Sequence, residues 1–188
     1  MRVGVVSIQG DFEKHIEALC RCAAAVEPVE VRTPEDLATV DRIIIPGGES
    51  TTVGLLMARF GLGAAIQQRA EEGMPVWGTC MGMIMMAHSI KERPNQYSLD
   101  LLDIEVERNA FGAQVHSFED GVIVNGLDRP VLGVFIRAPV VTQLGEGVEA
   151  LASYEGKVVA VRQGRRLGTS FHPELTADTC LHEWFLQI

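Results

Sequence analysis

A cysteine flanked by glycines is the residue with the clearest chemical potential. Cys80 lies in residues 78–82 (Gly-Thr-Cys-Met-Gly), between a short apolar segment and a helix-like segment. The pattern is typical of a strand–turn–helix elbow, whose sharp turn needs small neighbours around the nucleophile. Such an elbow places the sulfur at a helix N-terminus, where the dipole and free N–H groups favour a thiolate. Taken alone, Cys80 could equally be a small buried hydrophobic residue.

A histidine and a glutamate form the second group, in residues 170–174 (Ser-Phe-His-Pro-Glu). Residues two apart on an extended chain point to the same side, and Pro173 biases His172 towards extended geometry. The carboxylate of Glu174 can then reach one ring nitrogen of His172, which leaves the other nitrogen free for a thiol. This is the logic of a Cys–His–acid triad. Alone, the run reads as a strand end with two solvated polar residues; together with Cys80 it favours a triad.

A glycine pair ends another apolar segment, in residues 45–52 (Ile-Pro-Gly-Gly-Glu-Ser-Thr-Thr), where Ser50 or Thr51 is suited to cap the next helix. Glycines let backbone N–H groups turn towards a ligand oxygen. The N–H groups of Gly48 and Met81 could therefore bind a tetrahedral oxyanion together. The simpler alternative is a strand-to-helix turn that needs glycine only for its shape. A phosphate loop is disfavoured because no Gly-Lys-Ser/Thr follows.

Strand-like and helix-like segments alternate through the first half of the chain and must position these motifs. Short apolar runs predict strands, and amphipathic segments between them predict helices. Alternation at these lengths implies a parallel sheet with helices on both sides. The expected strands are 3–8, 27–32, 42–46 and 75–78, and the expected helices are 11–24, 50–60, 62–72 and 83–88.

The second half has shorter, turn-bounded strands and two runs typical of hairpin loops, 155–157 and 163–165. A helix over 176–186 can close the fold. We find no linker, repeat or low-complexity stretch, so residues 1–188 are expected to form a single domain. The expected strands of this half are 104–107, 121–124, 133–136, 150–154, 158–162 and 167–171.

The composition is that of an ordinary soluble globular chain, with 188 residues, 47% hydrophobic and 22% charged. The net charge of −9 argues against nucleic acid or an anionic membrane as partner. No apolar run approaches the roughly 18 residues of a membrane-spanning helix. The cysteines have no Cys-x-x-Cys spacing and form no metal-ligand cluster with the histidines, so we expect a reduced cytoplasmic protein without metal. His15, His88 and His182 fit helical surfaces and are expected to be non-catalytic.

Together these runs resemble the class I, or triad, glutamine amidotransferases, and most closely the glutaminase subunits of pyridoxal 5′-phosphate synthases. The cysteine elbow and His-Pro-Glu are shared by triad amidotransferases in general. The closer resemblance covers nearly the whole chain and rests on residues 46–52, 106–112 (Val-Glu-Arg-Asn-Ala-Phe-Gly) and 134–139 (Val-Phe-Ile-Arg-Ala-Pro). It implies a three-layer α/β fold with a mostly parallel central sheet, helices on both faces and a C-terminal antiparallel portion. His116 stands where we expect an acid and is assigned no role.

The resemblance also implies a reaction, which needs no cofactor. Cys80 would attack the side-chain amide of L-glutamine, His172 would pass a proton to the leaving ammonia, and Glu174 would orient His172. A glutamyl thioester would form, and water would release glutamate. An arginine suits the substrate α-carboxylate, although isolated arginines are more often solvated or structural. The residues implied to contact glutamine are Gly48, Glu49, Ser50, Arg108, Ile136 and Arg137.

A partner is implied by the resemblance alone. In this family ammonia passes to a synthase subunit with a (β/α)8 barrel, in a hetero-oligomer that makes the vitamin B6 cofactor. Gln9 lies in the region that the family uses for docking and for setting up the oxyanion loop.

Three alternatives stay open. The same triad serves glutaminase subunits of other amidotransferase pathways and γ-glutamyl hydrolases. A non-catalytic subunit of the same fold is disfavoured because all three triad positions hold competent residues. A redox or chaperone protein with an elbow cysteine would not need the His-Pro-Glu run.

Overall fold

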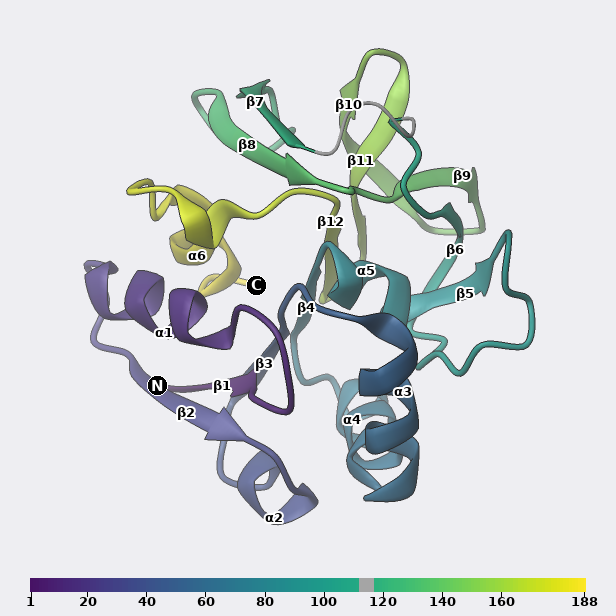
Figure 1. Ribbon diagram of the computed structural model, residues 1–188. Helices are drawn as coiled ribbons and strands as arrows, with labels where there is room; N and C mark the ends of the chain where they lie inside the picture. Colours follow the sequence, from purple (N-terminus) through teal and green to yellow (C-terminus); the bar gives the residue numbers. More distant parts are fainter. Residues whose placement is uncertain (112–116) are drawn as a thin grey trace.

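Helices and strands alternate through the first half of the chain, as predicted (Figure 1). The computed structural model describes residues 1–111 and 117–188. The helix pair over 50–72 is divided at Gly61, whose φ of 75° is a left-handed conformation that glycine adopts readily. The elements of this half are β1 (Arg2–Val6), α1 (Phe12–Arg21), β2 (Glu27–Val31), α2 (Pro34–Leu37), β3 (Arg42–Ile45), α3 (Ser50–Arg59), α4 (Leu62–Glu71), β4 (Val76–Thr79) and α5 (Met81–Met86).

The second half is dominated by short strands, also as predicted. The two expected hairpin loops are present: Tyr154 pairs with Lys157, and Gln163 pairs with Arg166. The elements are β5 (Ala87–Ile90), β6 (Leu102–Glu107), β7 (Ser117–Val122), β8 (Val131–Ile136), β9 (Val140–Leu144), β10 (Glu149–Tyr154), β11 (Lys157–Gln163), β12 (Arg166–Thr169), the 3-10 turn η1 (Pro173–Leu175) and α6 (Cys180–Phe185).

One ten-stranded sheet organises the molecule, in the order β2-β1-β3-β4-β12-β11-β9-β6-β5, with β10 paired to β11. The neighbours from β2 to β12 are parallel, whereas β12, β11, β9 and β6 pair antiparallel along the second half. Strands β7 and β8 form a separate antiparallel pair. The predicted mostly parallel sheet with an antiparallel C-terminal portion is therefore confirmed.

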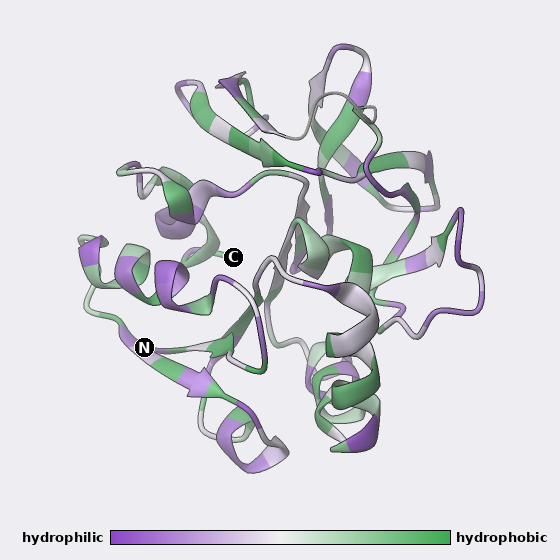
Figure 2. Cartoon of the chain, in the orientation of Figure 1, coloured by the Kyte–Doolittle hydropathy of each residue, from purple (hydrophilic) through white to green (hydrophobic). Residues whose placement is uncertain are grey.

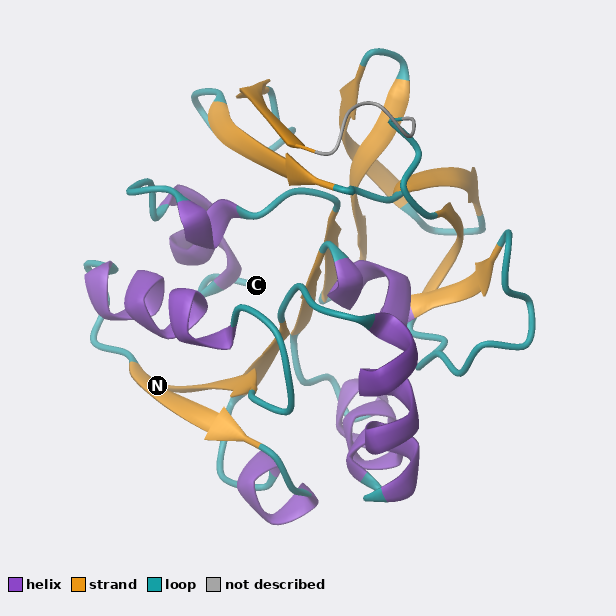
Figure 3. Cartoon of the chain, in the orientation of Figure 1, coloured by secondary structure: helices purple, strands orange, loops and turns teal. Residues whose placement is uncertain are grey.

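Helices cover both faces of the parallel strands, so the fold has three layers (Figure 3). On β3, Ile43 and Ile45 face a core built with α3, α4 and α5, whereas Ile44 faces a core built with α1 and α6. All three isoleucines are fully buried. This explains why residues 43–45 read as a continuous apolar run, because each side of the strand meets a helix. In contrast, α1 alternates polar and apolar residues along its length (Figure 2), as expected for a helix with one solvated side.

The structure corrects the sequence prediction at several elements. It adds α2, β5 and β9. The helix expected over 83–88 ends at Met86, so that His88 lies in a strand and not on a helix. The closing helix is shorter than predicted, because only Cys180–Phe185 are helical. The segment after β12 is not extended as far as Glu174, which lies in the turn η1.

Two general properties complete the description. No helix within residues 1–111 and 117–188 is long and apolar enough to cross a membrane. The cysteines Cys20, Cys22, Cys80 and Cys180 are all free thiols. His116 lies outside the described residues.

Candidate active site

A cavity of about 300 Å³ opens at the carboxyl ends of the parallel strands, where α/β sheets commonly bind ligands. It gathers segments that follow β1, β3, β4, β6, β8 and β12. Every predicted site residue lines it except Glu174, which is buried behind His172. The predicted residues in the lining are Gln9, Gly48, Glu49, Ser50, Cys80, Met81, Arg108, Ile136, Arg137 and His172.

Cys80 occupies the predicted elbow between β4 and α5, with φ of 49° and ψ of −105°. Its glycine neighbours have a steric reason. A Cβ on Gly78 would collide with the backbone of Gly82, and a Cβ on Gly82 would collide with the carbonyl of Ile45. The turn is therefore open only to glycine at these two positions, which confirms the elbow expected from residues 78–82.

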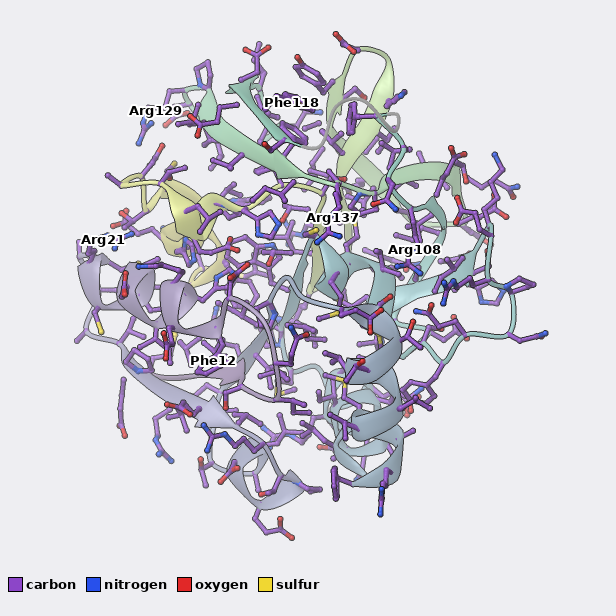
Figure 4. All side chains as sticks on the ribbon, viewed as in Figure 1. Phe12, Arg21, Arg108, Phe118, Arg129 and Arg137 are labelled. Carbon is purple, nitrogen blue, oxygen red and sulfur yellow. The ribbon has the colours of Figure 1, made fainter. Side chains whose placement is uncertain are left out.

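Left-handed backbone concentrates around the cavity. Among the described residues, Cys80, Asn109 and Arg137 are non-glycine residues with φ between 45° and 50° that line it. Such conformations cost free energy and persist only where the surroundings impose them, which is common at functional sites. In Figure 4 the labelled Arg137 lies beside the turn that enters α5, and the labelled Arg108 lies on the side of α5 that faces β6.

The acid and base of the predicted triad are in direct contact. His172 Nδ1 lies 2.7 Å from Glu174 Oε1, and the two residues are 3% and 2% exposed. The predicted contact is thus present, although the predicted extended geometry is wrong for Glu174. A 3-10 turn beginning at Pro173 brings the carboxylate back to the ring. The His172 backbone N–H donates to Val134 O, at 2.8 Å, which anchors the base to β8.

The electrostatics of His172 favour its protonated form. Burial alone lowers the pKa of His172, but hydrogen bonds and charge interactions with Cys80 and Glu174 outweigh it and raise that pKa to about 10. Burial also raises the pKa of Glu174, against the opposing effect of His172. A positive imidazole between a sulfur and a carboxylate is the arrangement that stabilises a thiolate nucleophile.

The glycine loop after β3 packs against both the base and Gln9. A Cβ on Gly47 would collide with the His172 ring, and a Cβ on Gly48 would come within 2.7 Å of Gln9 Oε1. That same Gln9 oxygen accepts the Glu49 backbone N–H at 2.9 Å. The loop is therefore held between His172 on one side and the end of β1 on the other.

Comparison with known proteins agrees with this site. The model of the SNO glutamine amidotransferase family matches residues 5–188. The chain belongs to this family. It is 53% identical to pyridoxal 5′-phosphate synthase subunit PdxT of Herpetosiphon aurantiacus over 99% of each chain, and 52% identical to the PdxT of Thermus thermophilus over 99% of this chain and 96% of that one. A solved structure described as a glutamine amidotransferase superposes with a TM-score of 0.93 at 49% identity, over 98% of this chain and 97% of the other.

In this amidotransferase, Glu49 caps a helix, a role that the sequence analysis predicted for Ser50 or Thr51. It is the N-cap of α3, and its carboxylate accepts the N–H groups of Thr51 at 3.1 Å and Thr52 at 2.7 Å. The predicted cap at Ser50 or Thr51 is thus wrong by one or two residues. The Thr52 backbone N–H is the main reason that the pKa of Glu49 falls to about 2.

Replacing Glu49 with glutamine should destabilise this amidotransferase by about 1 kcal/mol at neutral pH, the usual value of a lost N-cap. The pKa of Glu49 is depressed from 4.5 to about 2 on folding, so its charge stabilises the folded state above pH 4.5 and ceases to do so as pH falls towards 2. Urea unfolding measures the free energy of unfolding of the wild type and of Glu49→Gln. The difference between the two free energies should narrow below pH 4.5. Glu71→Gln, at an exposed glutamate of α4, is the control. A pH-independent difference would contradict the charge explanation.

Sequence reasoning did not select four residues of the amidotransferase cavity: Gly10, Asp11, Ile84 and Asn109. Asp11 is half exposed, and its Oδ2 lies 4.0 Å from His172 Nδ1. The position of Asp11 in the loop after the first strand could have indicated it, since the carboxyl ends of parallel strands share one edge. Asp11, His172 and Glu174 lie close enough to suggest a metal site, but His172 Nδ1 already bonds Glu174 and has no free lone pair to offer.

The prediction for two histidines of this amidotransferase was wrong. His15 and His182 do not lie on helical surfaces but are both 0% exposed, between α1, α6 and β4. His88, in contrast, is exposed and pairs with Asp100. An amphipathic pattern tells that a helix has a buried side, but not that a polar residue on it will be enclosed.

Proposed function

We propose that this chain hydrolyses L-glutamine to L-glutamate and ammonia, and delivers the ammonia to a partner subunit for the synthesis of pyridoxal 5′-phosphate. The observation that carries the proposal is the buried His172–Glu174 pair beside an elbow cysteine, inside a cavity. The pathway rests on the PdxT relatives, which are named as subunits of pyridoxal 5′-phosphate synthase and are about half identical over the full chain.

The reaction follows from the placement of these groups. The Cys80 sulfur attacks the δ-carbon of glutamine, and the carbonyl electrons move to the oxygen, which the N–H groups of Gly48 and Met81 stabilise. His172, which carries the proton, gives it to the nitrogen as the C–N bond breaks, so that ammonia leaves and a glutamyl thioester remains. His172 then takes a proton from water, which attacks the thioester and releases glutamate with the proton returned to the Cys80–His172 pair. Glu174 keeps the ring oriented throughout.

Glutamine is proposed to lie against Gly48, Glu49, Ser50, Arg108, Ile136 and Arg137, all of which line the cavity. The two guanidinium groups are suited to its α-carboxylate. Main-chain carbonyls are suited to its ammonium group. The Ile136 carbonyl lies 3.8 Å from Cys80 Sγ, so the substrate would pass close to the nucleophile at this point. The Glu49 carboxylate is occupied by its helix cap and its backbone N–H by Gln9 Oε1, so we assign its substrate contact to the backbone carbonyl.

Replacing Arg108 or Arg137 with alanine should raise the KM for glutamine by about 10- to 100-fold. Hydrogen bonds to a charged group contribute about 1.5–3 kcal/mol, and 1.4 kcal/mol corresponds to a factor of ten. The turnover number should change much less, because the arginines hold a part of the substrate that does not react. Steady-state kinetics checks this, with Arg59→Ala as the control at an arginine outside the cavity. An unchanged KM in both variants would refute the assignment of the α-carboxylate site.

We further propose that residues 1–188 act as one glutaminase domain in the cytoplasm, without a cofactor or metal of its own and without a nucleic-acid or membrane partner. The proposed partner is a (β/α)8-barrel synthase subunit in a hetero-oligomer. Gln9 is the candidate residue at the interface, because it lies at the rim of the cavity and contacts the glycine loop. Docking of the barrel subunit near Gln9 would therefore affect the position of the glycine loop, whose Gly48 N–H is a proposed oxyanion donor.

The test is glutamate release from L-glutamine by the purified chain, alone and with a pyridoxal 5′-phosphate synthase barrel subunit. We expect low activity alone and a clear rise with the partner. Full activity that ignores the barrel subunit would keep the chemistry and refute the pathway. In that case γ-glutamyl peptides would be tested as substrates, because a γ-glutamyl hydrolase would cleave them and a synthase glutaminase would not.

A further inference from the structure

Two histidines that the proposed mechanism does not use form a buried hydrogen-bonded pair behind the triad acid. His15 Nδ1 lies 3.0 Å from His182 Nε2. On its other side, His15 Nε2 lies 3.1 Å from Thr79 Oγ1 and 3.4 Å from Glu174 Oε2. Thr79 directly precedes Cys80, so one imidazole touches both the strand that carries the nucleophile and the carboxylate that orients the base.

The surroundings of both rings favour the neutral form of the imidazole. Burial, and next the neighbouring His182 and His172, hold the pKa of His15 well below its usual value. Burial, with a smaller effect of Arg21, lowers the pKa of His182 to about 3. A neutral imidazole has one nitrogen that donates and one that accepts. The two rings therefore hold two N–H groups, and their placement can be worked out from the partners.

Only one placement gives an acceptor to the N–H groups of both rings. His182 Nδ1 is buried and has no hydrogen-bond partner among the described residues. If that nitrogen carried the proton, a buried N–H would be orphaned, which costs more than an unused acceptor. The proton of His182 therefore lies on Nε2 and is donated to His15 Nδ1. His15 must then carry its own proton on Nε2, pointing at Thr79 and Glu174.

The His15 Nε2–H also lies close to an oxygen of Glu174. Glu174 Oε1 accepts from His172, whereas Glu174 Oε2 is buried and makes no standard hydrogen bond among the described residues. A buried carboxylate without a donor on one oxygen is costly and easily protonated. His15 Nε2–H bonds the Thr79 hydroxyl at 3.1 Å and lies 3.4 Å from Glu174 Oε2, where it makes a favourable electrostatic contact.

A buried tryptophan packs against both histidines. Trp77 lies two residues before Thr79 on the same side of β4, and its ring meets His15 and His182 edge-on at centroid distances of 5.8 and 5.0 Å. The Trp77 indole N–H donates to Thr169 Oγ1, at 3.1 Å, which fixes the indole in turn. The buried indole therefore packs against both histidine rings.

We infer that His15 is a positioning residue of the triad: its Nε2–H holds the free oxygen of Glu174, in a tautomer that His182 imposes. His15 does not touch the substrate. It acts through Glu174, by keeping the carboxylate ionised and aligned on His172 Nδ1. The inference rests on the proposed glutaminase function for its kinetic effect, but the tautomer itself is independent of any activity.

The kinetic test compares His15→Leu with His15→Gln in the complex with a barrel synthase subunit. Leucine removes the donor, and we expect kcat for glutamate release to fall about 10- to 100-fold, as when a group that orients another is lost. The KM for glutamine should change less than about threefold, because no substrate contact is removed. In His15→Gln, the side-chain amide of the new residue can donate a hydrogen bond in place of Nε2–H, so this variant should recover most of kcat. His88→Gln, at the exposed histidine of β5, is the matched control.

The second measurement reads the wild-type chain directly. Long-range ¹H–¹⁵N spectra of the histidine rings distinguish the two neutral tautomers, and the His15 signals are assigned in the wild type by correlating the ring with its backbone resonances. We expect His15 as the Nε2–H tautomer. An Nδ1–H tautomer would overturn the inference, even if both His15 variants failed to fold.

The outcomes separate the two proposals. If the wild-type complex releases no glutamate, the proposed function is refuted while the spectra still test His15. If the wild type is active and His15→Leu keeps its kcat, the positioning role is refuted and the glutaminase stands. A His15→Gln variant as impaired as His15→Leu would refute the donor role in the same way.

Discussion

Replacing Cys80 with alanine is expected to lower glutamate release by about 10⁵- to 10⁶-fold, the scale on which hydrolases lose turnover when the nucleophile is removed. Without the sulfur no thioester can form, and the cavity holds no other thiol, since Cys20, Cys22 and Cys180 do not line it. The fold should be unaffected, because alanine fits an elbow whose tight positions are Gly78 and Gly82.

The measurement is glutamate release in the presence of the barrel synthase subunit, with circular dichroism to compare the folds. Cys20→Ala, at an exposed cysteine of α1, is the matched control and should keep full activity. Alkylation by iodoacetamide, followed by mass spectrometry, should modify Cys80 in the wild type and inactivate it. Activity of Cys80→Ala above about one per cent of wild type would return attention to another nucleophile or to a contaminating glutaminase.

Replacing Glu174 with glutamine is expected to lower kcat by about 10³- to 10⁴-fold with little change in KM, the scale seen when the acid of such a triad becomes an amide. The amide lacks the negative charge that, together with Cys80, raises the pKa of His172 to about 10. It can also present its NH₂ group to His172 Nδ1, 2.7 Å away in the wild type, and so reverse the tautomer of the base.

Two observations test this explanation. The first is the separation of kcat from KM, with Glu119→Gln on the exposed β7 as the control. The second is the pH dependence of Cys80 alkylation. A raised pKa means that His172 keeps its proton until the pH approaches about 10, so loss of Glu174 should move the upper limit of the thiolate–imidazolium pair to lower pH. An unchanged profile would contradict a charge effect of Glu174.

The sequence by itself determined the parts whose chemistry is local. The glycines around Cys80 are readable because a sharp turn excludes side chains, and the structure gives the collisions that a Cβ would make at Gly78 and Gly82. The alternation of strands and helices is readable because periodicity follows burial. The contact between His172 and Glu174 was also predicted, although through the wrong backbone geometry.

The roles expected for Arg108 and Arg137 came from the resemblance to a known family and not from local sequence patterns. Nothing in the spacing of Arg108 and Arg137 distinguishes them from solvated arginines, and they reach the cavity from separate segments, one after β6 and one after β8. Their placement depends on how the antiparallel half folds back over the elbow. No local rule predicts this, because the energy of that arrangement is spread over the whole core.

The tertiary structure alone decided how distant residues meet. Strand β12 pairs in parallel with β4, with Thr169 opposite Thr79, and the Cys80 N–H donates to Thr169 O at 2.7 Å. This single pairing brings the chain that leads to His172 beside the nucleophile. Enclosure of His15 and His182 was likewise invisible in the sequence, because it requires α1 and α6 to close over β4 together. Local patterns record which side of an element is buried, whereas only the assembled layers determine which buried polar groups find one another.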